Sequence, residues 1–181
     1  MKIAVYCSSS NNIASEYKTE ATKLGLWIAQ KQHTLVYGGA TGGLMSAVSE
    51  AAASKNAQII GVISKAIVRM NRQSSDCTQL ITVESMSERK TKMLGIADIF
   101  VVLPGSFGTL DEMFDHVSSA IVGEHKKPLI VVNQNGFYDE LKQLIVKMHT
   151  QGFITVDNYK PSFVDNIESC IELINKLAEQ R

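Results

Sequence analysis

Residues Pro104 to Glu112 combine glycines, a hydroxyl and a carboxylate in one short segment. Gly105 and Gly108 favour a tight turn between an apolar run and a helix-like pattern. Such a turn leaves backbone N–H groups that can bind an anion, and the helix dipole adds positive potential there. Thr109 adds a hydroxyl, and Glu112 follows about one helical turn later. The pattern predicts a site for a ligand that carries a phosphate beside a reacting or hydrogen-bonding group.

A second glycine-rich turn, Tyr37-Gly38-Gly39-Ala40-Thr41-Gly42-Gly43, also joins a strand-like run to a helix-like run. Its spacing is neither the G-x-G-x-x-G of a dinucleotide site nor the G-K-[ST] ending of a P-loop. Two interpretations are open: a tight strand-to-helix connection, or ligand contact through the turn. Two such turns in one sheet favour a site of nucleotide size.

Other polar residues have both a chemical and a structural interpretation. Arg89, within Ser87-Glu88-Arg89-Lys90, can bind a phosphate or a polar sugar edge with its planar fork, or lie on a solvated helix face. The hydroxyls that follow Cys7 can contact a ligand or cap the next helix, and Cys7 itself is expected to pack rather than react. The four histidines and three cysteines lack metal-ligand or disulfide spacing, so no metal site is expected.

Composition is ordinary for one globular domain over residues 1–181, with 45% hydrophobic and 20% charged residues. Lys+Arg and Asp+Glu are both 18, which gives no support for a nucleic-acid polymer or a membrane surface as partner. No apolar run is long enough to cross a bilayer, and the N-terminal one is too short for a signal peptide. Unpaired cysteines fit a reducing compartment, so a cytoplasmic location is expected.

The elements that must position these residues alternate along the chain. Strands are expected near 2–6, 34–37, 58–63, 79–83, 98–103 and 128–133. Helices are expected near 14–31, 43–55, 87–96, 108–121, 136–150 and 163–179. Ser85 and Glu88 have capping-box spacing, and the irregular stretch 64–78 is expected to hold a loop or a short helix.

Repeated strand–helix units predict a single-domain, Rossmann-like α/β fold, doubly wound, with a mainly parallel sheet and helices on both faces. Runs such as Leu129-Ile130-Val131-Val132 lack alternation, which is typical of strands covered on both faces. In such sheets ligands bind at the carboxyl ends of the strands, near the switch in strand order. Both glycine turns follow strands and are expected at that edge.

Together the motifs resemble the Lonely Guy (LOG) family, whose members are nucleoside 5′-monophosphate phosphoribohydrolases long misannotated as lysine decarboxylases. The motifs that carry the resemblance are Pro104-Gly105-x-x-Gly108-Thr109-x-x-Glu112, Glu88-Arg89-Lys90 and Gly38-Gly39-x-x-x-Gly43-Leu44-Met45. The resemblance extends from Val5 to Ile154. Nothing in the sequence resembles a pyridoxal-phosphate lysine site, so decarboxylation is not supported.

The resemblance implies hydrolysis of the N-glycosidic bond of a nucleoside 5′-monophosphate, such as a cytokinin riboside monophosphate or AMP, without metal or organic cofactor. The products would be a free base and ribose 5-phosphate, which places the protein in cytokinin biosynthesis. A homodimer or higher homo-oligomer is implied, with sites near the subunit interface. Arg89 and Glu112 would be the catalytic pair. The implied substrate- and phosphate-binding residues are Ser9, Gly38, Gly39, Gly43, Asn71, Lys90, Gly105, Ser106, Gly108, Thr109 and Ser118.

The chain departs from the family pattern around the pair, at Ser8, Ser46, Ser64, Asn71, Ser87 and Ser106. Asn71 stands where a substrate-contacting Glu is expected, and Ser106 where the motif usually has a second Gly. We expect an ordinary backbone at Ser106, with its hydroxyl donating to phosphate. A non-catalytic nucleotide-binding or molybdenum-cofactor carrier protein of the same fold is the alternative; the intact Arg89 and Glu112 favour the enzyme.

Overall fold

The computed structural model describes residues 1–155 and 158–180. One seven-stranded sheet has the order β4-β3-β2-β1-β5-β6-β7, and every neighbouring pair is parallel. The strands are β1 (Lys2–Tyr6), β2 (Thr34–Tyr37), β3 (Gln58–Ser64), β4 (Gln79–Val83), β5 (Ile99–Val102), β6 (Leu129–Val132) and β7 (Ser162–Val164). The helices are α1 (Ser15–Gln30), α2 (Gly43–Ala53), α3 (Lys65–Val68), α4 (Met86–Ile96), α5 (Phe107–Ile121), α6 (Asp139–Thr150) and α7 (Ile167–Glu179), with a 3₁₀ turn η1 (Gln134–Gly136).

The direction in which strands are added reverses between β1 and β5. The chain adds β2, β3 and β4 on one side of β1, then crosses over to build β5, β6 and β7 on the other. Val5 pairs with Val101 and Tyr6 with Val102, so the segments after β1 and β5 leave the sheet side by side. The predicted doubly wound, parallel α/β fold is confirmed, and this reversal is where ligands bind in such sheets.

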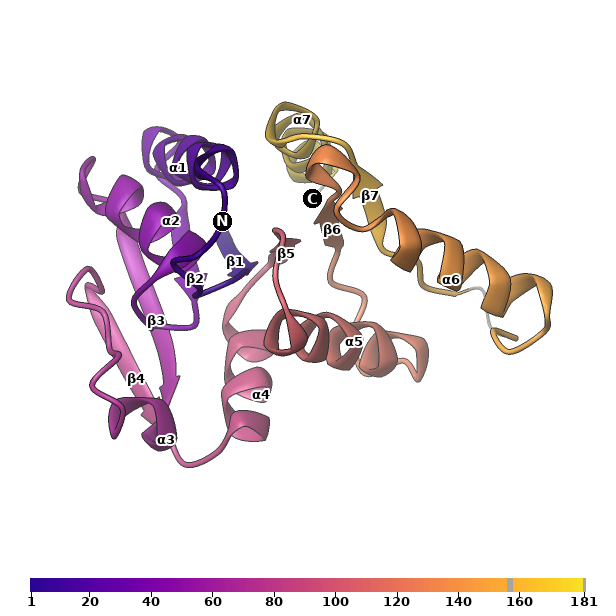
Figure 1. The fold of residues 1–181 in the computed structure, drawn as a ribbon, viewed down its shortest axis with the longest axis horizontal. Coiled ribbons are helices and arrows are strands. Elements are labelled where there is room, and N and C mark those ends of the chain that lie inside the picture. Colours follow the sequence, from indigo (N-terminus) through magenta and orange to yellow (C-terminus); the bar gives the residue numbers. More distant parts are fainter. Residues whose placement is uncertain (156–157, 181) are drawn as a thin grey trace.

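Helices cover both faces of the sheet (Figure 1). Alternate residues of β1 belong to separate cores: Ile3 and Val5 pack with α1, α2 and α7, whereas Ala4 and Tyr6 pack with α4 and α5. Because the central strands β1, β2, β5 and β6 are buried on both sides, their sequences are nearly continuous apolar runs, as predicted, whereas the edge strands β4 and β7 are more exposed.

The predicted helix from residue 163 is wrong at its start. Ser162–Val164 is strand β7, which pairs with β6 through Val131 and Phe163, and α7 begins at Ile167. The side chain of Asn166 caps α7 by accepting a hydrogen bond from the Ser169 N–H at 2.8 Å. The apolar residues of β7 also fit a helical stripe, so periodicity alone could not separate the two elements.

Two local predictions hold with small changes. The Ser85 hydroxyl caps α4 by accepting from the Glu88 N–H at 3.1 Å, while the Glu88 carboxylate accepts from the Glu84 N–H at 2.8 Å. The irregular stretch contains the single-turn α3, as expected. Helix α6 begins at Asp139 rather than near 136, because Asn135 has a φ of 53° in the preceding turn.

Candidate active site

The start of α5 has backbone N–H groups available for an anion. Ser106 is the N-cap residue, and its side chain makes no capping hydrogen bond. In the described part of the chain, the N–H groups of Phe107, Gly108 and Thr109 have no protein acceptor, and Ser106, Phe107 and Gly108 are exposed. Free N–H groups and the positive end of a four-turn helix dipole form an anion-binding arrangement.

The glycines of this turn do not have unusual backbone angles, and Gly105 instead allows a close approach. Neither Gly105 nor Gly108 has a positive φ. A Cβ at Gly105 would lie 2.1 Å from Oγ1 of Thr109, which is buried, so a side chain there would displace the threonine. Ser106 has φ −104° and ψ −154°, ordinary extended backbone, so serine fits here as expected.

Arg89 of α4 and Glu112 of α5 form a buried ion pair between Nη1 and Oε1. Their exposed fractions are 2% and 3%. The Arg89 Nε also donates to the Val62 carbonyl of β3 at 2.9 Å. A Cβ at Gly38, just after β2, would lie 2.1 Å from Arg89 Nη2. Arg89 is therefore inserted at the carboxyl edge of the sheet and does not lie on a solvated helix face.

Burial dominates the electrostatics of the pair. Burial raises the pKa of the Glu112 carboxyl above its ordinary value, and the attraction of Arg89 opposes this without cancelling it. Burial and the Glu112 charge together raise the pKa of the Cys7 thiol, and do the same to the Tyr6 hydroxyl. Cys7 is thus a packed, neutral thiol, as expected. The charge of Glu112 acts on Tyr6 and Cys7, so the carboxylate lies near the end of β1.

The second glycine turn is a tight connection, and the N–H groups of its second half are already bound by protein atoms. Gly39, Gly42 and Gly43 have φ of 65°, 102° and 53°, values that other residues rarely adopt. The acceptors lie in the segment after β1 and in α2: Gly43 N–H donates to Asn11 Oδ1, Leu44 N–H to the Ser8 carbonyl, and Gly42 N–H to Ser46 Oγ, each at 2.9 Å. Of the two interpretations left open, the structure favours the connection.

This packing joins the two turns. A Cβ at Gly43 would lie 2.4 Å from the Ser10 carbonyl oxygen, so the backbone of residues 8–10 rests on the turn. On its other side, the Ser8 N–H donates to the Pro104 carbonyl at 3.2 Å. The glycines at 42 and 43 therefore position the α5 start indirectly, through the segment after β1.

The remaining expected site residues divide between this edge and other places. Half-buried Ser9 lies at the edge, between the two turns. Lys90 lies on α4 next to Arg89, but its ammonium is held by Asp111 at 2.9 Å and Asp115 at 3.0 Å. Asn71 is exposed, has a φ of 55°, and follows the end of α3. Ser118 lies apart from the pair, further along α5.

Arg72 is a residue at this edge that sequence reasoning missed. Its Nη2 donates to the carbonyl oxygens of Ser9 at 3.3 Å and Thr41 at 3.0 Å. Its own carbonyl accepts from the Thr41 N–H at 2.8 Å. Arg72 thus ties the irregular segment to both neighbouring loops. No motif marks it, because its position depends on the path of an irregular segment.

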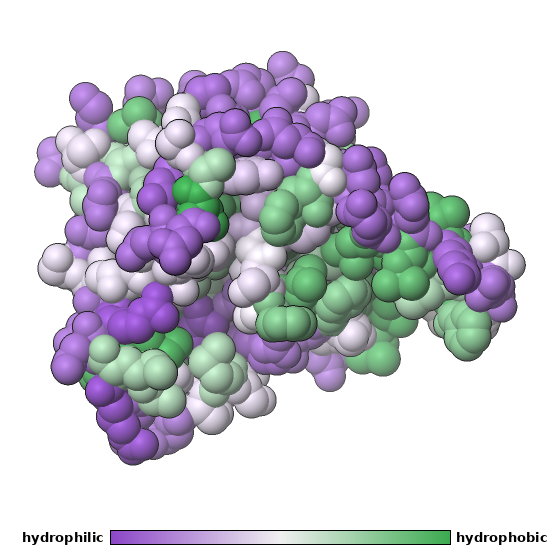
Figure 2. All heavy atoms as spheres, viewed as in Figure 1, coloured by the Kyte–Doolittle hydropathy of each residue, from purple (hydrophilic) through white to green (hydrophobic). Residues whose placement is uncertain are grey.

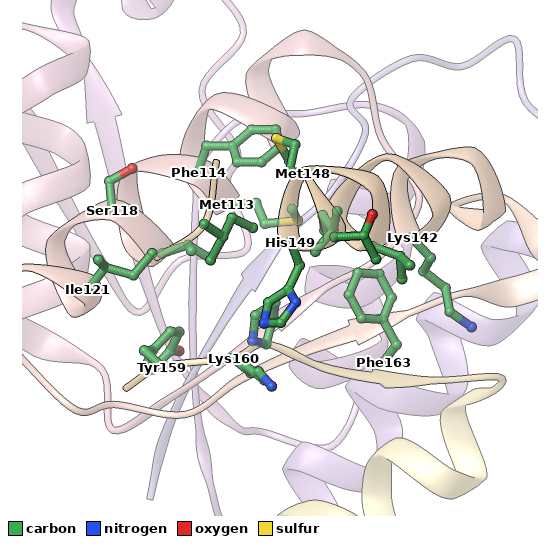
Figure 3. A pocket seen from close by; sticks show the side chains of 16 residues that line it. Met113, Phe114, Ser118, Ile121, Lys142, Met148, His149, Tyr159, Lys160 and Phe163 are labelled. Carbon is green, nitrogen blue, oxygen red and sulfur yellow. The ribbon is translucent and has the colours of Figure 1, made fainter. Parts of the chain in front are cut away.

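A cavity of about 610 Å³ lies elsewhere, between α5, α6 and the segment that leads into β7. Figure 3 shows Met113, Phe114 and Ile121 on one side of it, and Met148 and His149 of α6 on the other. Ser118 lines this cavity. Since its walls are mainly apolar, the cavity does not have the chemistry of a phosphate site.

Residues 1–155 and 158–180 contain neither a metal-binding cluster nor a membrane-spanning helix. No cluster of three or more His, Cys, Asp or Glu side chains there could hold a metal ion. Within the same ranges, every helix is too short or too polar to cross a membrane.

The fold and the site define a class: a Rossmann-like α/β protein with an anion-binding helix start beside a buried arginine–glutamate pair. Comparison with solved structures gives the same fold. The Moco carrier protein from Chlamydomonas reinhardtii matches with a TM-score of 0.75, covering 99% of this chain and 98% of that one, at 18% sequence identity.

Sequence comparisons identify the family. The family model "Possible lysine decarboxylase" matches residues 45–177. The chain is 35% identical to the cytokinin riboside 5′-monophosphate phosphoribohydrolase LOG of Oryza sativa subsp. japonica, over 98% of this chain and 73% of the relative. It is 33% identical to LOG4 of Arabidopsis thaliana, over 98% of this chain and 82% of the relative. The chain belongs to the LOG family, which confirms the resemblance seen in its motifs.

Proposed function

We propose that this protein is a nucleoside 5′-monophosphate phosphoribohydrolase, which releases a free base and ribose 5-phosphate. The observation that carries the proposal is the buried Arg89–Glu112 ion pair, on the same edge of the sheet as the unsatisfied N–H groups of α5. The relatives from rice and Arabidopsis, both named as phosphoribohydrolases, support the same activity. The protein is therefore an enzyme acting on a glycosidic bond.

The start of α5 binds the 5′-phosphate in this proposal. Phosphate oxygens accept hydrogen bonds from the N–H groups of Phe107, Gly108 and Thr109, and from the Ser106 hydroxyl. A Cβ at Gly108 would meet no protein atom within 4 Å, so the protein itself does not require glycine there. We attribute this glycine to the close approach of the phosphate.

The reaction is hydrolysis at the C1′ carbon of the ribose. The C1′–N bond breaks with its electron pair leaving on the base, a water oxygen bonds to C1′, and a water proton ends on the base. The transition state carries positive charge on the sugar, which the Glu112 carboxylate stabilises. Arg89 orients that carboxylate and holds the substrate. Burial of the pair strengthens its effect, because few water molecules screen it.

The substrate we propose is a purine nucleotide, either AMP or a cytokinin riboside 5′-monophosphate. The second follows the names of the rice and Arabidopsis relatives and would place the chain in cytokinin biosynthesis. Ser9, Gly38, Gly39 and Gly43 shape the edge beside the sugar and base in this proposal. Asn71 and Ser118 are kept as substrate contacts from the resemblance alone.

We also propose that the chain forms a homodimer through α5 and α6. Apolar side chains gather where these helices lie (Figure 2), including Phe114 at 40%, Leu144 at 50% and Val146 at 61% exposed. Together with the apolar cavity between the helices, they form one apolar surface, and such surfaces often mark protein–protein interfaces. A second copy would cover it and bring the two α5 helices together.

Incubation of the purified protein with a panel of nucleoside monophosphates tests the function. Release of base together with equimolar ribose 5-phosphate, detected by chromatography, is the expected result. Tight nucleotide or molybdenum-cofactor binding without base release would favour the carrier alternative. The shared fold of the Chlamydomonas protein makes that alternative worth including in the panel.

A further inference from the structure

Two ion pairs lie next to each other between α4 and α5. Consecutive residues of α4, Arg89 and Lys90, meet consecutive residues of α5, Asp111 and Glu112. Lys90 also binds Asp115, one helical turn beyond Asp111, at 3.0 Å. The buried pair is the proposed reaction centre, and the outer cluster of Lys90, Asp111 and Asp115 forms a second layer on it.

The position of the outer cluster affects how α5 lies against α4 more than it affects the free energy of unfolding. Lys90 is 14% exposed, whereas Asp111 and Asp115 are 52% and 45% exposed, so water screens their attraction. Exposed pairs of this kind add little to folding stability. The apolar contact of α4 and α5 comes from a core that contains Met93 and Met113. A lysine between two carboxylates one turn apart instead limits rotation and sliding of α5 against α4.

We propose that Lys90, Asp111 and Asp115 are positioning residues, which hold α4 and α5 in the register that brings the Arg89 guanidinium onto the Glu112 carboxylate. This inference rests on the proposed function for its consequence in catalysis. The side chains of Lys90, Asp111 and Asp115 need not touch the substrate for this role. From the resemblance we expected Lys90 to contact substrate, and the test separates the two roles.

The outer cluster also acts on Glu112 through its charges. The groups that influence or face the carboxylate are Arg89 and Lys90 of α4, Asp111 of α5, and Tyr6 and Cys7 at the end of β1. Lys90 favours the ionised form of Glu112, and Asp111 disfavours it. Removing one charge or the other must therefore move the titration of Glu112 in opposite directions.

The test compares Lys90→Met, Asp111→Asn and Lys90→Arg with the unchanged protein. Lys23→Met is the matched control, because Lys23 also joins two carboxylates, Glu20 and Glu168, on α1 and α7. Two readouts are needed: the pH dependence of kcat and KM, and the titration of the Glu112 carboxyl carbon followed by NMR. The NMR readout requires no substrate.

We expect Lys90→Met to lower kcat about tenfold at constant KM. The acidic limb of the kcat profile and the Glu112 titration should both move to higher pH in this variant, and both should move to lower pH in Asp111→Asn. Lys90→Arg should keep the kcat of the unchanged protein, and Lys23→Met should change neither kcat nor the Glu112 titration. A large rise in KM for Lys90→Met with kcat intact, or a Glu112 titration that does not move, would overturn the inference. Absence of base release by the unchanged protein would overturn the proposed function instead, since the NMR titration still tests the cluster.

Discussion

At the scale of single residues, the site depends on a charge pair that the protein has almost entirely removed from water. Desolvation makes such a pair costly, and loss of one partner leaves the other uncompensated. Arg89 and Glu112 have further restraints, since Val62 and Gly38 fix the guanidinium on two sides. The desolvation free energy has a function if the carboxylate faces the positive charge that develops on the substrate, because a buried carboxylate stabilises that charge more strongly.

Glu112→Gln tests the carboxylate directly. The variant keeps size and hydrogen-bonding capacity but removes the charge, so we expect kcat to fall about a hundredfold or more. Nucleotide affinity, measured by calorimetry, should fall much less, because the phosphate is bound at the start of α5. Near-normal turnover would remove Glu112 from the mechanism.

Gly38→Ala tests the placement of Arg89. The new Cβ would lie 2.1 Å from Nη2, so the guanidinium must move from Glu112 and we expect kcat to fall at least about tenfold. Gly95→Ala, on the same helix as Arg89, is the control, because its Cβ would meet nothing within 4 Å. That variant should keep full activity and gain up to about 1 kcal/mol in denaturant unfolding. Equal activity of the two variants would contradict the geometry.

Sequence predicted the residue types of this site better than their environments. Motif spacing indicated Glu112, and the family resemblance added Arg89 as its partner, yet the contact between the two depends on how α4 and α5 meet. The ordinary backbone at Ser106 could be argued in advance, whereas Arg72 could not. Sequence left the turn at Gly42 and Gly43 open between a tight connection and ligand contact, because the Asn11 and Ser8 acceptors that decide it lie some thirty residues away along the chain.

At the scale of elements, α5 joins the two halves of the proposed site. Its first turn presents the N–H groups, and its second turn carries Glu112 into the core. Sequence predicted α5 well because glycine, proline and amphipathic spacing agree there. Strand β7 could not be distinguished from the start of α7 in the sequence, because its three residues are too few to show a strand or a helix period.

His116 joins the second half of α5 to the segments before β6 and β7. Its ring is 2% exposed, and its Nε2 lies 2.9 Å from the Tyr159 hydroxyl and 3.0 Å from the Lys127 carbonyl. Burial lowers the pKa of His116 to about 4, against 6.5 for an unperturbed imidazole. Its contribution to stability is therefore complete above pH 6.5 and is lost as the pH falls toward 4.

His116→Gln removes this titration and keeps a polar group at the position. Between neutral pH and pH 4, we expect the unchanged protein to lose about 3 kcal/mol more unfolding free energy than the variant. Urea unfolding at several pH values gives this difference. Identical pH dependence of the two proteins would show that His116 does not titrate as its burial requires.

At the scale of the whole molecule, the apolar surface over α5 and α6 remains exposed in a single chain. Composition alone could not reveal it, because 45% hydrophobic residues is ordinary and only the fold shows which of them face outward. The homodimer was expected from the resemblance, and the position of its interface is a proposal from the structure.

Val146→Glu tests that interface. Val146 is 61% exposed and lines the cavity, so a charge there should split the dimer into monomers by light scattering at micromolar concentration. Met70→Glu is the control, since Met70 is 68% exposed but lies on the irregular segment after α3. A monomeric unchanged protein would contradict the dimer itself. A Val146→Glu variant that remains a dimer would show that the interface is wrongly placed.

The central claim is that one site binds a 5′-phosphate at the start of α5 and cleaves the glycosidic bond beside Arg89 and Glu112. The measurement that tests it most directly is the ratio of kcat/KM for AMP to kcat/KM for adenosine. Charge-assisted hydrogen bonds to the phosphate predict that AMP is cleaved at least about a hundredfold better. Equal cleavage of AMP and adenosine, or cleavage of no nucleoside monophosphate at all, would contradict the account.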